Sequence, residues 1–143
     1  MGGQLLLGTT LIVVNVIFHV SWLVWLAQAL IRVGKASFFD GRRRWLILQL
    51  GLGVFGVIAV HTVAAWSWAA VYLVVGEFST LSRALYFSVV TSTTLGYGDI
   101  TLSERWQLLG SFEAMGGLVL FGASTAFLLS VMKHWFTHLA DKD

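Results

Sequence analysis

Residues 84–99 read ALYFSVVTSTTLGYGD, and this stretch decides the fold of the chain. It begins inside a short apolar segment, about residues 80–93, which leads directly into two glycines separated by one tyrosine. A helix needs about 20 apolar residues to cross a bilayer, so this segment is too short to span one. Irregular backbone is tolerated at membrane depth only where protein or water surrounds it. The pattern therefore predicts a short helix that enters the membrane and a loop that returns to the same side.

Three longer apolar segments flank this stretch, at about residues 5–31, 45–75 and 106–132, and each is long enough to cross a bilayer. The composition agrees, because 57% of the residues are hydrophobic and 11% are charged, against about 25% charged in a soluble domain. We expect a single all-α membrane domain with an extra N-terminal helix, an outer helix, a re-entrant segment over residues 80–99 and an inner helix. The chain has no cysteine, which excludes disulfides and thiolate metal sites.

The positive charges predict the orientation in the membrane. Five of the nine Lys and Arg residues lie between the first and second segments: Arg32, Lys35, Arg42, Arg43 and Arg44. Such a cluster between two spanning segments is typical of a cytoplasmic loop. Because the positive charges do not lie on a helical stripe or a tail, we expect no nucleic-acid partner. The N-terminus is then outside and the C-terminus cytoplasmic, in a multi-pass protein of the plasma (inner) membrane. About ten residues follow the third segment, so we expect no soluble regulatory domain in this chain.

The TTLGYGD segment resembles the signature T-V-G-Y-G-D of the potassium channel pore-domain family, with Leu95 in place of valine. The resemblance extends through the aromatic pair Tyr86 and Phe87 and covers about residues 45–132. It is to the bacterial form, a two-helix pore with a re-entrant filter loop, to which this chain adds one N-terminal helix. It implies a potassium-selective channel made with three further copies of the chain in a lipid bilayer, with no cofactor other than bound K⁺. It also implies an ion-binding filter of five residues: Thr94, Leu95, Gly96, Tyr97 and Gly98.

In such a filter, rings of backbone carbonyls from four chains replace the water around a potassium ion. Glycines at positions 96 and 98 supply positive φ at little steric cost. The side chains of Leu95 and Tyr97 would then face away from the ion, and we expect them to pack on the preceding helix beside Tyr86 and Phe87. Asp99 would lie at the outer mouth. Ser79 and Thr80 are candidate N-caps of that helix.

Two departures from the family pattern concern the surroundings of the filter. Some members have a glutamate in the short helix that pairs with the aspartate after the filter, and here that position is Val90. The proline often found after the filter is absent, since the chain contains none. The alternative to a conducting channel is a nonconducting or regulatory channel-like subunit. We expect no enzymatic activity, because no arrangement of nucleophile, base and oxyanion donors is recognisable.

The third long segment carries polar and small residues inside the membrane. Glu113 is predicted to be a brace against the back of the short helix or a titratable gate, and the simpler alternative is a protonated or hydrogen-bonded buried acid. Gly116 and Gly117 are either a gating hinge or a site of close helix packing. If the family register continues past these glycines, Phe121 and Thr125 face a central cavity.

The four histidines form two sets. Asn15 and His19 share one face of the first helix, because they lie four residues apart, and His61 on the second helix is a candidate neighbour. The simplest interpretation of this set is a group of satisfied buried polar side chains. His134 and His138 are also four apart, at the cytoplasmic end of the third segment. They either bind metal or sense pH in a fourfold assembly, or lie among lipid headgroups.

Overall fold

The computed structural model describes residues 2–36 and 42–140, and within these ranges it does not describe the side chains of residues 34–36, 42–43, 46 and 134–140. The described chain consists of four helices: α1 (Gly2–Ala36), α2 (Arg42–Val74), α3 (Leu81–Ser92) and α4 (Gln107–Ala140). Three of them are long and apolar enough to cross a membrane, over residues 2–33, 47–74 and 107–133. The predicted all-α membrane fold is therefore confirmed.

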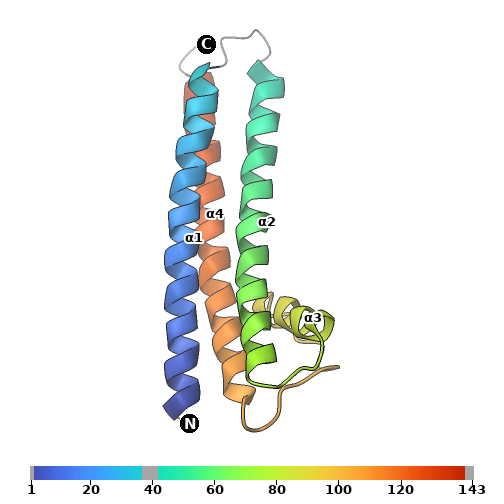
Figure 1. Cartoon of the computed structure of the whole chain (residues 1–143). Helices are drawn as coiled ribbons and strands as arrows, with labels where there is room; N and C mark the ends of the chain where they lie inside the picture. The colour runs from blue at the N-terminus through green and yellow to red at the C-terminus, as the bar shows by residue number, and fades with distance from the viewer. Residues whose placement is uncertain (1, 37–41, 141–143) are drawn as a thin grey trace.

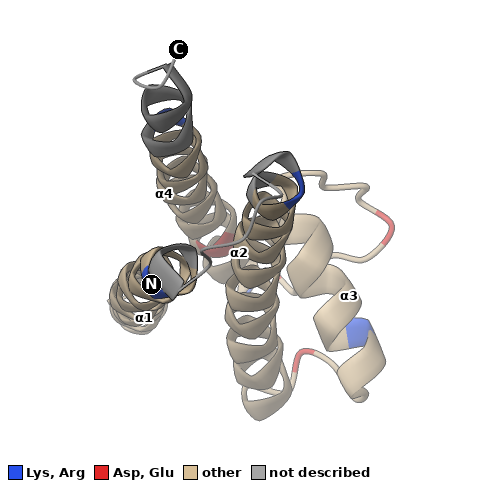
Figure 2. Ribbon diagram, turned by 90° about the horizontal axis from the view of Figure 1, so that it is seen from above, with Lys and Arg blue, Asp and Glu red and all other residues tan. Residues whose placement is uncertain are grey.

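The three long helices lie side by side, and the short helix α3 leans against one end of them (Figure 1). Helix α1 packs on α4 and α2, whereas α3 packs on α2 and α4 only. Viewed along the long helices, α1 and α3 lie on opposite sides of the α2–α4 pair (Figure 2). The N-terminus lies at the same end of the molecule as α3, where Gln4 Nε2 donates a hydrogen bond to the carbonyl of Arg105.

The connection from α2 to α3 is built from local hydrogen bonds. Gly76 has φ +80°, its N–H donates to the Leu73 carbonyl at 3.1 Å, and the Glu77 N–H donates to the Tyr72 carbonyl at 3.0 Å. These two bonds form a Schellman motif, which satisfies carbonyls at the end of α2 and turns the chain. Helix α3 then begins after the predicted N-cap Thr80, whose hydroxyl oxygen accepts from the Arg83 N–H.

Aromatic packing holds α3 against the long helices. The ring of Tyr72 on α2 contacts the rings of Phe87 on α3 and Phe78 edge-on, with centroids 5.2 and 6.1 Å apart. Edge-to-face contacts of this kind add to the free energy of burial. The core cluster also contains residues of α2, α3 and α4: Trp68, Ala69, Ala84 and Leu109.

Helix α1 approaches its neighbours closely at two glycines. A Cβ added to Gly8 would lie 2.7 Å from Phe112, and one added to Gly56 would lie 2.5 Å from Leu26. Because membrane helices gain little from hydrophobic burial against lipid, small residues and interhelical hydrogen bonds supply much of the attraction. One such bond runs from Trp22 Nε1 to the Gly56 carbonyl at 2.9 Å. Helix α1 therefore packs closely against both α2 and α4.

Candidate functional site

The TLGYGD loop, residues 94–99, follows directly from the end of α3. The N–H groups of Leu95 and Gly96 both donate to the Val90 carbonyl, at 3.1 and 3.2 Å. The φ angles of Thr94, Gly96 and Gly98 are +60°, +53° and +75°, whereas Leu95 and Tyr97 between them do not have positive φ. The sign of φ therefore alternates along the loop. The predicted positive φ of both glycines is confirmed, and that of Thr94 was not predicted.

The conformation of Thr94 is strained. It is the one non-glycine residue with positive φ in the described part of the chain, and a β-branched residue is rarely found there. Such a conformation costs on the order of 1–3 kcal/mol and persists only where the surroundings impose it. The hydrogen bond from the Thr94 N–H to the Thr91 carbonyl, at 2.9 Å, is one such constraint.

Two side chains of the loop are exposed in the single chain. Leu95 is 55% exposed and Tyr97 is 66% exposed. The prediction that they pack on the preceding helix, beside Tyr86 and Phe87, therefore stays a prediction.

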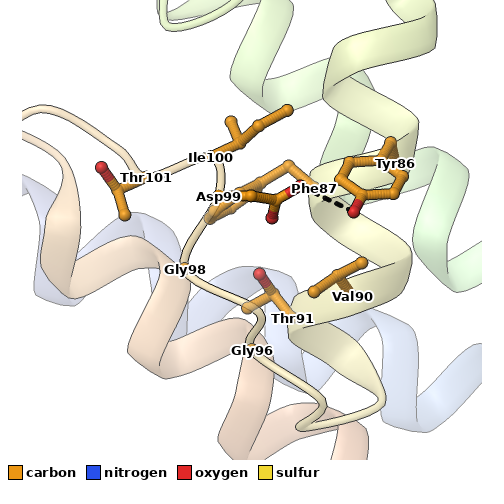
Figure 3. Close-up of a pocket in the computed structure, with 9 residues that line it drawn as sticks. All are labelled: Tyr86, Phe87, Val90, Thr91, Gly96, Gly98, Asp99, Ile100 and Thr101. Carbon is orange, nitrogen blue, oxygen red and sulfur yellow. Dashed lines mark hydrogen bonds between the residues drawn. The ribbon is translucent and has the colours of Figure 1, made fainter.

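Asp99 at the end of the loop is held by α3. The Tyr86 hydroxyl donates to Asp99 Oδ2 at 2.8 Å, as the dashed line in Figure 3 marks. This hydrogen bond raises the pKa of Tyr86 above its ordinary value. A hollow of about 180 Å³ lies between α3 and the loop, and Val90 and Thr91 line it together with Gly98 (Figure 3). Tyr86 was expected only as an aromatic packing residue, so its polar contact with Asp99 is new.

The segment after the loop is fixed by a second carboxylate. Glu77 accepts from the Ser103 N–H at 2.8 Å and from the Ser103 hydroxyl at 2.6 Å. This pair ties the α2–α3 connection to the turn that leads into α4. Neither residue was singled out from the sequence, although Ser103 lies just before an expected helix, where serine is a common cap.

Glu113 on α4 is fully buried behind α3. Its Oε2 accepts from the Tyr72 hydroxyl at 2.6 Å, and its Oε1 accepts from the Ser88 hydroxyl. The Ser88 hydroxyl oxygen also lies 2.8 Å from the carbonyl oxygen of Ala65. A single carboxyl group thus joins α4 to α2 and α3. Tyr72 and Ser88 were not predicted as its partners, and the only signal for them is that each is polar within an apolar helix.

Gly117 lies where α4 meets the end of α3. A Cβ built on Gly117 would lie 2.0 Å from the carbonyl oxygen of Ser92, so no side chain fits. At Gly116 the added atom would lie 3.2 Å from Ile12 of α1. The α4 helix is continuous through both glycines. This geometry gives Gly117 a close-packing role, and the gating hinge stays a prediction.

The other predicted residues of α4 lie nearer its C-terminal end. Thr125 is exposed, and the Phe121 ring stacks on His61 of α2 with centroids 4.3 Å apart. Their place in a central cavity stays a prediction. The side chains of His134 and His138 lie outside the described residues, as do those of Lys35, Arg42, Arg43 and Lys142. His19, His61 and Ser124 meet between the three long helices.

The site brings together a strained loop whose φ alternates in sign, a carboxylate at the end of that loop, and a short helix that ends where the loop begins. In the described part of the chain no group of three or more His, Asp or Glu side chains is placed to hold a metal ion.

A family model described as "Ion channel" matches residues 50–134, which is more than half of the chain and includes α3, the loop and most of α4. Helix α1 lies outside the match. No solved structure matches the chain.

Proposed function

Because the chain belongs to the ion channel family, we propose that it is one of four identical subunits of a potassium-selective channel whose ions pass along the TLGYGD loop. Family membership places the protein in the membrane and points to ion transport rather than catalysis. The observation that carries the finer proposal is the alternating sign of φ over residues 94–98. When φ alternates in sign, successive carbonyl groups point to the same side of the strand. Such a row of carbonyls can replace the water around a potassium ion.

The chemistry of the loop favours a backbone filter. Residues 94–98 contain no acidic side chain, so the oxygen ligands available to an ion are backbone carbonyls and the Thr94 hydroxyl. Asp99, at the end of the loop, adds a negative charge at the mouth. The strained φ of Thr94 supports the same assignment, since strained backbone is concentrated at functional sites.

The exposed residues of a single chain support a fourfold assembly. One strand of carbonyls cannot surround an ion, whereas four strands around an axis can. Leu95 and Tyr97 are exposed in the single chain, and so are several apolar residues of α4 that α1, α2 and α3 leave uncovered: Leu118, Val119 and Leu129. Neighbouring copies would cover these side chains. The α4 helices would then line the axis, with Phe121 and Thr125 at a central cavity.

The orientation follows from joining the charge pattern to the fold. The hydrogen bond from Gln4 to Arg105 keeps the N-terminus at the same end of the molecule as the loop. The arginine cluster of residues 32–44 lies where α1 ends and α2 begins, at the opposite end. The positive-inside rule favours the cytoplasm for that end, so the N-terminus and the filter would face outward across the plasma (inner) membrane.

Cation flux into liposomes that contain the purified protein tests the proposal. We expect K⁺ and Rb⁺ to pass much faster than Na⁺. Gly96→Ala adds a Cβ at φ +53° and should abolish this difference or the flux itself, whereas Gly51→Ala, where the added Cβ meets no atom within 4 Å, should leave it unchanged. Tyr97→Asp should weaken selectivity, because a charged side chain next to the filter needs water. Equal Na⁺ and K⁺ fluxes in the unaltered protein would overturn the proposal, and absence of flux would favour a nonconducting subunit.

A further inference from the structure

A polar cluster lies at the middle of the three long helices, about two helical turns along α4 from Gly117, which lies against the end of α3. His19 Nε2 of α1 is 2.9 Å from Ser124 Oγ of α4, and His61 Nε2 of α2 is 3.1 Å from the same oxygen. The two imidazole rings meet edge-on with centroids 4.9 Å apart. His19 is fully buried and Ser124 nearly so. One hydroxyl group therefore connects three helices through two histidines.

The positions of the hydrogens in this cluster follow from counting donors. The Ser124 hydroxyl has one hydrogen, so it can donate to one histidine, and the other histidine must donate to it. His19 Nδ1 is buried and has no hydrogen-bond partner. A buried N–H without an acceptor is rarer than an unpaired acceptor, which favours an unprotonated Nδ1. His19 Nε2–H then donates to Ser124, and the Ser124 hydroxyl donates to His61 Nε2. In this arrangement both histidines are neutral.

No charge near the cluster could stabilise a protonated histidine. On α4, the charged residues nearest to Ser124 in sequence are Glu113 and Lys133, and each is more than two helical turns away. Helices α1 and α2 have no Asp, Glu, Lys or Arg within two turns of His19 or His61. Helix α3 does not pack on α1, and its buried Ser88 hydroxyl donates to Glu113 rather than to a residue of the cluster.

The polar neighbours of the cluster are paired with each other. Asn15, one turn before His19, accepts from the Ser67 hydroxyl at 3.0 Å and donates to the Leu11 carbonyl at 2.9 Å. A proton added to the cluster would therefore place an unpaired charge among apolar side chains at membrane depth, which is costly.

The cluster touches the stretch of α4 that the proposed function places at the cavity. Ser124 directly precedes Thr125, and the His61 ring stacks on Phe121 with centroids 4.3 Å apart. At Gly8 of α1 the contact with α4 is apolar, against Phe112. His19 and Ser124 thus form a polar contact by which α1 holds this part of α4.

We propose that His19 and His61 are positioning residues that hold the cavity-lining stretch of α4 through Ser124, and that acid releases this hold by protonating them. The cavity role rests on the proposed function, whereas the release of α1 from α4 does not. Histidine is the side chain that changes charge between pH 5 and 8. Protonation becomes favourable only if α1 separates from α4 enough to admit water, so acid should move the C-terminal end of α1 away from α4.

Electron spin resonance distances test this movement directly, and the absence of native cysteine makes labelling simple. Spin labels are attached at Ile31→Cys and Met132→Cys, both exposed and near the C-terminal ends of α1 and α4. These ends lie at the same end of the molecule (Figure 1), so the distance between the labels reports the separation of α1 from α4. Labelled chains are diluted with unlabelled ones in liposomes so that distances are measured within one chain. We expect a short distance at pH 8 and a population at longer distance at pH 5.

Four variants separate protonation from simple loss of packing. His19→Gln and His61→Gln keep a donor or an acceptor for Ser124 without a titratable group, so the distance should stay short at both pH values. His19→Ala removes the contact, so the distance should be long at both. The pair His134→Gln with His138→Gln, changed together as the control, should respond to acid as the unaltered protein does.

The outcomes are decisive whether or not the protein conducts potassium. An unchanged distance between pH 8 and pH 5 in the unaltered protein would overturn the proposal, and so would an acid response that survives His19→Gln and His61→Gln or disappears in the control. If the distances behave as expected, the K⁺ flux should show an acid-dependent change that His19→Gln removes. A distance change without any K⁺ flux at either pH would contradict the proposed function and leave the release of α1 supported.

Discussion

Two tyrosines donate hydrogen bonds of similar length to carboxylates, and burial should decide which one stabilises the fold. Tyr72 donates to Glu113 at 2.6 Å in the buried core, whereas Tyr86 donates to Asp99 at 2.8 Å on the exposed side of α3. The two phenol-to-carboxyl contacts are chemically alike. Changing each tyrosine to phenylalanine removes one oxygen and leaves the ring, so the pair forms a matched comparison.

The expected magnitude for Tyr72→Phe follows from the buried partner that it leaves behind. A hydrogen bond contributes about 0.5–1.5 kcal/mol, or about 1.5–3 kcal/mol when one group is charged, and a buried polar atom left unpaired costs about 1–3 kcal/mol. Glu113 is fully buried and would keep only the contact from Ser88. We expect Tyr72→Phe to lower the free energy of unfolding by about 2 kcal/mol. In Tyr86→Phe, water can replace the lost donor to Asp99, so we expect little change in stability.

Unfolding by titration with a denaturing detergent, followed by helical circular dichroism, measures the two effects on the same protein. A double variant of Tyr72→Phe with Ser88→Ala should lose more stability than either change alone, because Glu113 then has no hydroxyl partner from α2 or α3. Equal stability of Tyr72→Phe and Tyr86→Phe would refute the reasoning, since it would mean that the buried carboxyl group does not need its donor.

Three further predictions concern packing, topology and assembly. Gly117→Ala places a Cβ 2.0 Å from the Ser92 carbonyl oxygen, so we expect it to lower the free energy of unfolding by about 1–3 kcal/mol or more. Gly122→Ala, whose added Cβ meets no atom within 4 Å in the single chain, should leave that free energy unchanged in the same unfolding assay. An impermeant thiol reagent on intact cells should label Gly3→Cys and not Ser37→Cys, because translocation of the neighbouring arginines is opposed, and the reverse pattern would invert the topology. Native mass spectrometry in detergent should give four chains per particle, and a uniform dimer would contradict the fourfold filter.

The sequence was informative where structure depends on neighbours close in the chain. The sequence predicted three helices long enough to span a membrane, a short helix between the second and third, an N-cap at Thr80 and positive φ at Gly96 and Gly98, and the structure shows each of these. Each depends on hydropathy over one segment or on the steric properties of one residue. Positive φ at Thr94 was not predicted, because threonine has no intrinsic preference for it and only the surrounding structure imposes it.

The amino-acid sequence by itself determined the number of spans, the place of the short helix and the loop, and the residues that carry polar groups into the membrane. Only the tertiary structure decided which residues those groups meet: Glu113 finds Tyr72 and Ser88, and His19 finds Ser124, which lies 105 residues away. The physical reason is that lipid is as apolar as a protein core. The long helices are apolar on nearly every side, so the hydrophobic pattern that identifies the buried face of a soluble helix carries little information here. Which faces meet is decided by close fit at small residues and by hydrogen bonds between helices, and both depend on all the helices at once.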